Sequence, residues 1–225
     1  MRDPSPESGL PLLIEDEVAT LQALGHVLRY PSGSVLFGEG EETDFALLIR
    51  SGHVKVQVGN PPHIVALRGP GEIIGEMAAV RHKPRSASVF ALDDVEALYL
   101  PATTWLHFLY AYPRAMHAQL IAADERLEEA TRKSVESFLG VEQRLAKGLV
   151  ELASKKLGIQ TESGLSLRFS QQDLADLVGA SRESVAQVIR RFKERSIVTT
   201  GRQVITIRDL PSLSRIAEGD FTTSP

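Results

Sequence analysis

The sequence predicts an α+β protein with an N-terminal β-roll of the double-stranded jelly-roll kind, a long central helix and a C-terminal winged helix-turn-helix. Short β-branched or alternating runs broken by glycine occupy the region from about 30 to 100. An uninterrupted helical repeat follows Pro113, and two short capped helices precede a hairpin near the C-terminus. We therefore expect three regions, 1–113, 114–140 and 141–225.

Composition excludes several classes of protein. Of the 225 residues, 24% are charged and 43% are hydrophobic, which is near the average for globular proteins and excludes disordered and collagen-like chains. The absence of cysteine excludes disulfides, thiolate-bound iron–sulfur clusters, cysteine zinc sites and thiol catalysis. Because there is no N-terminal apolar segment and no run of about 18 apolar residues, we expect a cytoplasmic protein.

The N-terminal region has the pattern of an antiparallel roll. Predicted strands are 34–37, 45–49, 53–58, 63–67, 87–91 and 95–100. Turn residues separate them: Gly33, Gly40, Gly52, Pro61, Pro62 and the stretch 69–71. Residues 12–28 and 101–114 are expected to form short helices at the edges of the roll.

The central helix has a narrow apolar stripe. Small or apolar residues recur at steps of four and three: Met116, Leu120, Ala123, Leu127, Ala130, Ser134 and Ser137. Such a seam with charged flanks is typical of a helix that pairs with its own copy, which predicts a two-fold dimer. The alternative is that the stripe packs on the β-roll.

The C-terminal region contains the most specific pattern. The chain is expected to be helical from 141 onward, with Gly158 as the C-cap, and a polar loop then runs to Gly164. After it, Ser170 can cap a helix that runs through Val178. Gly179 supplies a positive-φ turn, and Ser181 can cap a second helix from 182 to about 194. The stretch that follows predicts a hairpin turning at Gly201 and Arg202, which is the wing. An ordinary αα-hairpin is the alternative.

Charge is distributed unequally. Residues 1–143 have 12 Lys and Arg against 20 Asp and Glu, whereas residues 144–225 have 13 against 9, so the two parts are −8 and +4. Between Arg182 and Arg208, seven cations face two anions. This local excess indicates a surface that binds phosphates, and a solvated face is the alternative.

The second helix of the motif has residue types that recognise base edges. Arg182 can donate to guanine O6 and N7, Glu183 can accept from cytosine N4, and Gln187 can pair with adenine or contact a phosphate. We expect phosphate contacts from Ser181, Arg190, Arg191 and Arg202. Ser170, Gln171 and Ser184 are further candidates for DNA contact. For each residue the alternative is an ordinary solvated side chain.

A second candidate site lies in the β-roll. Gly75 can open a helical turn, so that the backbone N–H groups of Glu76, Met77 and Ala78 face an anion. Arg85 can bind a phosphate through two hydrogen bonds, with Ser86 beside it, and Glu76 can accept from a ribose hydroxyl. Together they predict a site for a small phosphorylated sugar. The alternative is that Arg85 and Glu76 pair with each other.

These features together resemble one family. Gly33, Gly40, Gly52 and Gly71, the Gly75-Glu76 pair, the sequence PRS at 84–86, the seam helix and the sequence SRESV at 181–185 are similar to the bacterial cyclic-AMP receptor protein and FNR superfamily of transcription factors, over roughly 12–215. The resemblance implies a cytoplasmic homodimer with a cyclic-nucleotide-binding β-roll and a dimerising central helix. It also implies a winged helix that recognises a palindromic promoter site, cyclic AMP as allosteric ligand, and RNA polymerase as a partner.

The resemblance also assigns roles to residues. Glu76, Arg85 and Ser86 match the residues that hold the ribose and the cyclic phosphate, and Thr131 and Arg132 are the nearest candidates for purine contacts from both subunits. Gln187 stands where the best-known members have an arginine, so the preferred operator differs from theirs. Alternatives on the same scaffold are constitutive activity or another effector: cyclic GMP, a redox signal, or a gas sensed through haem at His82.

An enzyme is the hypothesis from a different class. A metal-dependent enzyme on a cupin-like barrel needs clustered metal ligands, yet the six histidines form no recognised ligand spacing. No nucleophile motif, Walker loop or acid pair is found either. We therefore expect no catalytic residues and no metal.

Overall fold

The computed structural model describes residues 11–155 and 157–220. These residues form two compact units, which we describe separately. The first contains residues 11–54 and 68–130, and the second contains the rest of the described chain, including the segment 55–67.

The first unit is a β-roll, as predicted. Its antiparallel strands belong to two four-stranded sheets with the orders β1-β8-β3-β6 and β2-β7-β4-β5. Residues 55–67 of β4 and β5 group with the second unit but complete the second sheet. The strands are β1 (His26–Tyr30), β2 (Val35–Phe37), β3 (Ala46–Ser51), β4 (Val54–Val58), β5 (His63–Arg68), β6 (Ile73–Ile74), β7 (Ser88–Ala91) and β8 (Val95–Leu100).

The core of this unit lies between the first sheet and the helices that pack on it. In the first sheet, Leu48 of β3 stands opposite Leu98 of β8, and both side chains are buried. Trp105 and Phe108 of α3 (Ala102–Ala111) pack into the same cluster, together with Ala115. Because burial of each large apolar side chain stabilises by about 1.5–3 kcal/mol, this cluster fixes α3 and the start of the next helix on the roll.

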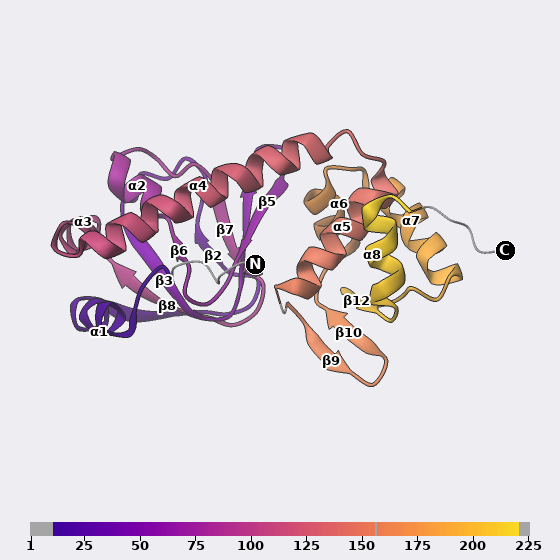
Figure 1. Cartoon of the computed structure of the whole chain (residues 1–225), viewed down its shortest axis with the longest axis horizontal. Coiled ribbons are helices and arrows are strands. Elements are labelled where there is room, and N and C mark those ends of the chain that lie inside the picture. Colours follow the sequence, from indigo (N-terminus) through magenta and orange to yellow (C-terminus); the bar gives the residue numbers. More distant parts are fainter. Residues whose placement is uncertain (1–10, 156, 221–225) are drawn as a thin grey trace, which may run out of the picture. The chain divides into compact units, whose positions relative to one another are not determined.

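The central helix, α4 (Pro113–Glu136), has two distinct faces. Proline at its first position suits the fixed φ of a helix start. Ala115 and Ala118 are buried against the roll, whereas Leu120 and Leu127 of the predicted seam are 68% and 66% exposed. The whole seam is exposed in the single chain, so the alternative that it packs on the β-roll is wrong. Figure 1 shows α4 as one uninterrupted helix.

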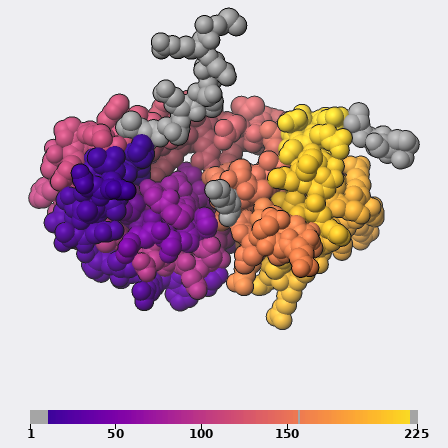
Figure 2. Space-filling view, turned by 60° about the horizontal axis from the view of Figure 1, so that its bottom comes forward, coloured from indigo at the N-terminus to yellow at the C-terminus, as the bar shows by residue number. Residues whose placement is uncertain are grey.

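The second unit contains the predicted helix-turn-helix and wing. Its four-stranded sheet has the order β11-β12-β10-β9. Helix α5 packs on α8, and the space-filling view shows α8 in yellow at the surface (Figure 2). The elements are α5 (Val141–Ser154), β9 (Ile159–Thr161), β10 (Gly164–Leu167), α6 (Gln171–Val178), α7 (Arg182–Glu194), β11 (Val198–Gly201), β12 (Val204–Ile207) and α8 (Leu210–Glu218).

Two predicted helices are shorter in the structure. The helix expected over 12–28 is α1 (Glu15–Leu24), and the chain then enters β1 through Gly25. A Cβ on Gly25 would lie 2.6 Å from the Tyr99 backbone oxygen, so the glycine allows β1 to approach β8. The helix expected over 101–114 is divided between α3 and the start of α4, with a break at Tyr112.

The helix predicted to end at Gly158 is also shorter, because α5 begins at Val141 and ends at Ser154. Gly158 has φ +128°, and a Cβ there would lie 2.6 Å from the Ser166 backbone oxygen. The polar stretch predicted as a loop pairs as the hairpin β9–β10, with Ile159 opposite Ser166. Gly158 is therefore a site of close strand approach and not the end of the helix.

No helix among the described residues is long and apolar enough to cross a membrane. The first ten residues, on which the prediction of no targeting segment rests, lie outside the described part of the chain.

Candidate ligand-binding and DNA-binding sites

The first site is built around Gly75, which joins β6 to the short helix α2 (Glu76–Arg81). Gly75 has φ +74°, a conformation that L side chains rarely adopt. A Cβ at this position would lie 2.5 Å from Arg85 Nη1 and 3.1 Å from the Phe45 backbone oxygen. Glycine is thus required both by the backbone and by the arginine packed against it.

Arg85 is held firmly in the interior, where its side chain is only 3% exposed. Its backbone N–H donates to Glu41 O at 2.9 Å and its backbone oxygen accepts from Gly40 N at 2.8 Å. The guanidinium lies 4.2 Å and 4.3 Å from the ring centroids of Phe37 and Phe45. Such cation–π contacts stabilise a desolvated arginine.

The hydrogen bonds of Arg85 leave one nitrogen unused. Nε donates to Thr43 Oγ1 and Nη1 donates to Gly75 O, both at 2.7 Å. Nη2 is buried, and no hydrogen-bond partner for it exists among the described residues. Burial lowers the pKa of Arg85, and the charges of Glu41, Asp44 and Glu76 oppose this shift. An unpaired buried donor costs about 1–3 kcal/mol, so this geometry suits an anion beside Nη2.

Glu76 is not paired with Arg85, so that alternative is also wrong. The Glu76 carboxylate, 5% exposed, accepts a hydrogen bond from Arg126 Nη1 of α4. Arg126 Nη2 also donates to Ile73 O at 2.7 Å. Sequence reasoning missed Arg126, although it lies eleven residues, or about three turns, after the buried Ala115 and therefore on the same side of the helix.

A second ion pair joins α4 to the roll one turn further along. Arg68, at the end of β5, is 8% exposed, and its Nη1 lies 3.1 Å from Glu129 Oε2. Arg68 Nε also lies 3.4 Å from Glu72 Oε1. The face of α4 that contacts the roll is therefore apolar near its start and charged after Arg126.

The other predicted ligand residues are placed as follows. Ala78 is buried in α2, Met77 is 49% exposed, and Ser86 is exposed directly after Arg85. Thr131 and Arg132 are exposed on α4, outside the stripe that contacts the roll. Their predicted purine contacts remain a prediction.

The second site is the helix-turn-helix of α6 and α7. Ser170 Oγ accepts from Asp173 N at 3.0 Å and Asp173 Oδ2 accepts from Ser170 N at 3.0 Å, which forms a capping box. Burial would raise the pKa of Asp173, but hydrogen bonds from Lys55 and Ser170 outweigh it and lower that pKa. Ser181 caps α7 by accepting from Ser184 N at 3.1 Å.

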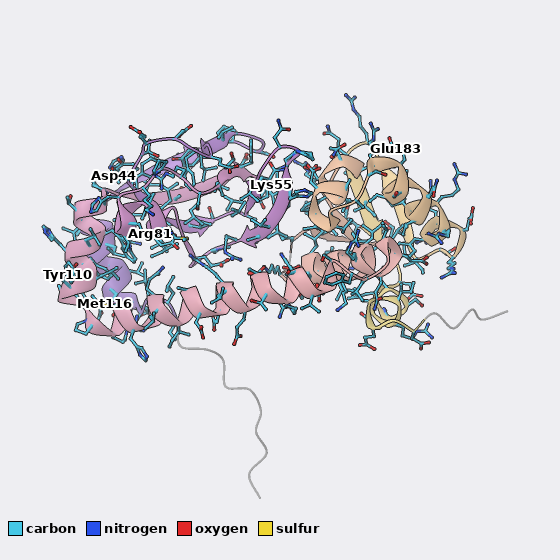
Figure 3. The ribbon with its side chains drawn as sticks, turned by 90° about the horizontal axis from the view of Figure 1, so that it is seen from above. Asp44, Lys55, Arg81, Tyr110, Met116 and Glu183 are labelled. Atoms are coloured by element: carbon cyan, nitrogen blue, oxygen red, sulfur yellow. The ribbon has the colours of Figure 1, made fainter. Side chains whose placement is uncertain are left out.

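Gly179 ends α6 in the left-handed conformation with φ +61°, as predicted. Val185, Val188, Ile189 and Phe192 of α7 are buried, and Leu174, Ala175 and Val178 of α6 are buried beside them. The predicted base-contacting residues therefore lie on the free side of α7: Arg182, Glu183 and Gln187 are exposed. Glu183 is labelled on the outer surface of the motif in Figure 3.

The predicted phosphate-contacting residues are exposed as well. Ser181, Arg190, Arg191 and Arg202 are on the surface, and Arg191 Nη1 lies 3.0 Å from Glu142 Oε2. Gln171 and Ser184 are half-buried at the starts of the two helices. The wing turns at Arg202 and Gln203, one residue later than predicted, because Gln203 has the positive φ of +56° and Gly201 pairs with Val204.

Comparison with known proteins identifies the family. Residues 27–112 match the cyclic nucleotide-binding domain, and residues 143–216 match the Crp-like helix-turn-helix domain. The chain is 31% identical over 194 residues to the cyclic AMP receptor protein of Thermus thermophilus, covering 84% of this chain and 87% of that one. The chain belongs to the CRP/FNR family of transcription regulators.

Other CRP/FNR relatives extend this likeness. The CRP-like cAMP-activated global transcriptional regulator of Mycobacterium tuberculosis is 28% identical over 208 residues, covering 89% of this chain and 92% of that one. The fold is similar to that of the c-di-GMP responsive regulator CLP of Xanthomonas campestris, with a TM-score of 0.76 and 23% identity over 86% of this chain and 99% of that one.

Membership of the CRP/FNR family confirms the predicted architecture and function class. The chain is a DNA-binding transcription regulator with a cyclic nucleotide-binding domain and a helix-turn-helix domain. Its relatives are regulators, which confirms the prediction that it is not an enzyme. The described residues contain no group of three or more His, Asp or Glu arranged to hold a metal ion.

Proposed function

We propose that cyclic AMP binds the β-roll of this regulator and switches its affinity for DNA. The observation that supports this most directly is the buried Nη2 of Arg85, which has no hydrogen-bond partner among the described residues. A cyclic phosphate beside Arg85 would accept that donor and neutralise a desolvated charge. Glu76, the residue after Gly75, would accept from the ribose hydroxyl. The names of the relatives from Thermus thermophilus and Mycobacterium tuberculosis support cyclic AMP as the nucleotide.

Binding at this site would also affect α4. The Glu76 carboxylate already accepts from Arg126, so a ribose hydroxyl that binds Glu76 must share it or displace Arg126. Either outcome changes a contact between the roll and α4. A ligand switches DNA binding only through different affinities for two arrangements of the protein, and this contact differs between the free and the occupied site.

We further propose that the regulator is a cytoplasmic homodimer that recognises a palindromic promoter site and acts with RNA polymerase. Pairing of two exposed seams on α4 would bury Leu120 and Leu127, and two-fold symmetry of the protein would match a two-fold operator. Arg182, Glu183 and Gln187 would contact base edges, and Ser181, Arg190, Arg191 and Arg202 would contact phosphates.

The first test is a calorimetric titration of the purified protein with cyclic AMP and with cyclic GMP. The wild type should bind cyclic AMP, and Arg85→Ala should bind at least about tenfold more weakly, because a charge-assisted hydrogen bond contributes about 1.5–3 kcal/mol. Arg81→Ala is the matched control, since Arg81 is an exposed arginine at the end of α2, four residues before Arg85. Equal affinity of the Arg85→Ala and wild-type proteins for cyclic AMP would exclude the proposed site. Binding of cyclic GMP but not of cyclic AMP would identify cyclic GMP as the ligand instead.

A further inference from the structure

Arg144, in the first turn of α5, forms hydrogen bonds only to backbone carbonyl groups in the described structure. Its Nη1 donates to Ser137 O at 2.9 Å and to Leu139 O at 2.6 Å. Its Nε donates to Val178 O at 2.8 Å, and its Nη2 donates to Gly179 O at 3.3 Å. One guanidinium, with five N–H groups in a fixed plane, therefore contacts four carbonyl oxygens.

These four carbonyls come from two helix ends. Ser137 and Leu139 lie one and three residues after Glu136, the last residue of α4, and Val178 and Gly179 are the last residue and the C-cap of α6. Carbonyl groups at a helix C-terminus lack partners within the helix and have a partial negative charge. Arg144 satisfies both ends at once, and all of the residues involved belong to the second unit.

The two helix ends have different roles. Residues 137–140 connect the central helix to the DNA-binding region, so we call them the hinge. Val178 and Gly179 belong to the turn that precedes Ser181, the cap of α7. Because the guanidinium is planar and rigid, a displacement of the hinge must move the turn or break bonds to it.

A neighbouring contact shows what is specific to Arg144. Lys147 Nζ, also on α5, lies 3.0 Å from Glu136 Oε1 and so joins α5 to the end of α4. This bond does not reach the turn between α6 and α7. Among the hydrogen bonds of the described residues, those of Arg144 connect the hinge directly with that turn.

We propose that Arg144 is a positioning residue that couples the hinge to the recognition helix α7. This inference rests on the proposed function, because the change at the hinge would originate at the ligand site. Helix α4 runs without interruption from Arg126, the partner of Glu76, to the hinge. Loss of Arg144 should therefore uncouple DNA binding from nucleotide binding without removing either.

The test compares wild type, Arg144→Gln and Arg144→Lys. Fluorescence anisotropy measures the affinity for a duplex selected from a random-sequence pool by the wild type, with and without saturating cyclic AMP. The affinity ratio, expected to be about 5–150-fold in the wild type, should fall to within about twofold of one in Arg144→Gln. Arg144→Lys keeps the charge but not the fixed fork, and its ratio should also fall. Nucleotide affinity in the absence of DNA should stay within about twofold of wild type.

Arg215→Gln is the matched control. Arg215 is an exposed arginine of α8 in the same unit, and its side chain donates to Ser212 Oγ at 3.0 Å. This variant loses the same charge and should keep the wild-type ratio. If the Arg144 variants lose DNA affinity equally with and without nucleotide, so that the ratio is unchanged, Arg144 has a structural role only and the proposal is overturned.

A second measurement separates this proposal from the proposed function. Amide hydrogen exchange needs no ligand, and Leu139→Gly should loosen the hinge. In the wild-type background this substitution should accelerate exchange at residues 179–182, and in Arg144→Gln it should have no further effect there. An equal increase in both backgrounds would contradict coupling through Arg144. Lack of any response to cyclic AMP in the wild type would instead contradict the proposed function.

Discussion

The packing around Arg85 requires a glycine, with no side chain, at position 75. Gly75 combines a positive φ with direct contact to the guanidinium, and a methyl group there would overlap Nη1 at 2.5 Å. The arginine is unable to move freely, because Phe37 and Phe45 enclose it on two sides. Residue identity at position 75 therefore determines the position of the charge at position 85.

We predict that Gly75→Ala weakens cyclic AMP binding by at least tenfold and destabilises the first unit by about 1–3 kcal/mol through backbone strain. Calorimetry measures the first effect and thermal unfolding measures the second. Gly201→Ala is the control for ligand binding, because Gly201 has no positive φ and lies in the wing, with its nearest neighbour 3.9 Å from the added Cβ. Wild-type affinity in Gly75→Ala would show that Arg85 does not hold the ligand.

Base recognition is also a property of single residues. Arg182→Ala should weaken the binding free energy for the selected duplex by about 1–3 kcal/mol and should change binding to random DNA little. The reason is that bidentate contact with guanine discriminates between bases. Arg202→Ala should instead weaken binding to both duplexes by a similar factor, as expected for a phosphate contact. Anisotropy titrations at one fixed salt concentration measure the affinity of each variant for the selected duplex and for random DNA, relative to the wild type. Equal losses on both duplexes for Arg182→Ala would assign Arg182 to a phosphate.

At the scale of elements, a charged pair joins α1 to the start of α4. Glu17 is 3% exposed, and it accepts from Arg114 Nε at 2.8 Å and from Ile14 N at 3.0 Å. Arg114 Nη1 and Nη2 also donate to Pro11 O and Leu12 O at 3.0 Å and 3.1 Å. The hydrogen bond from Arg114 is the main reason that the pKa of Glu17 is lowered from its ordinary value.

We predict that Glu17→Gln lowers the free energy of unfolding of the first unit by about 2 kcal/mol at pH 7, as expected for a hydrogen-bonded charge. A lowered pKa stabilises the folded state fully above the ordinary value of 4.5, and this stabilisation is lost as pH falls through the folded-state pKa. The difference between wild type and variant should therefore shrink below about pH 4.5.

Fluorescence of Trp105, the single tryptophan, reports this unfolding, because it is buried in the same cluster as Leu21 of α1. Glu15→Gln, on the exposed side of α1, is the control and should have little effect. A difference between Glu17→Gln and wild type that is constant from pH 7 to pH 3 would contradict this role of the carboxylate.

Elements with strong local signals were predictable from sequence. The capped helices α6 and α7 follow from Ser170, Gly179 and Ser181, because these residues fix helix ends through local bonds. Strand β1 and the hairpin β9–β10 were not predicted, since Gly25 allows β1 to approach β8 and Gly164 allows β10 to approach β12, both strands distant in sequence. A pattern of local propensity contains no signal for such contacts.

The same distinction applies to the ligand site. Gly75, Glu76 and Arg85 belong to one short stretch, and their residue types already indicate phosphate binding. Arg126 lies 50 residues after Glu76, and the partnership depends on how α4 is seated on the roll. Residues in an exposed charged run look alike in the sequence, so the one that contacts Glu76 was identified only from the structure.

At the scale of the whole molecule, the predicted dimer depends on the exposed seam of α4. We predict that the wild type is a dimer in sedimentation velocity and that Leu120→Glu with Leu127→Glu is a folded monomer. Burying unpaired carboxylates in an apolar seam is costly, whereas both side chains are already exposed in the single chain. Figure 3 labels Met116, the first residue of this seam.

Glu128→Lys is the control for the dimer. Glu128 is exposed on α4 but outside the seam, so this charge reversal should leave the dimer intact. A dimer that survives both seam substitutions would place the interface elsewhere on the chain. A monomeric wild type would remove the basis for recognition of a two-fold operator.

The uninterrupted α4 also has a mechanical consequence. A helix of 24 residues is about 36 Å long, so a tilt of about 5° at its first end would move its other end by about 3 Å. That displacement equals the length of a hydrogen bond such as those from Arg144 to the hinge carbonyls. The helix would then act as a lever, and a small rearrangement beside Glu76 would be geometrically sufficient to break or form contacts at the hinge.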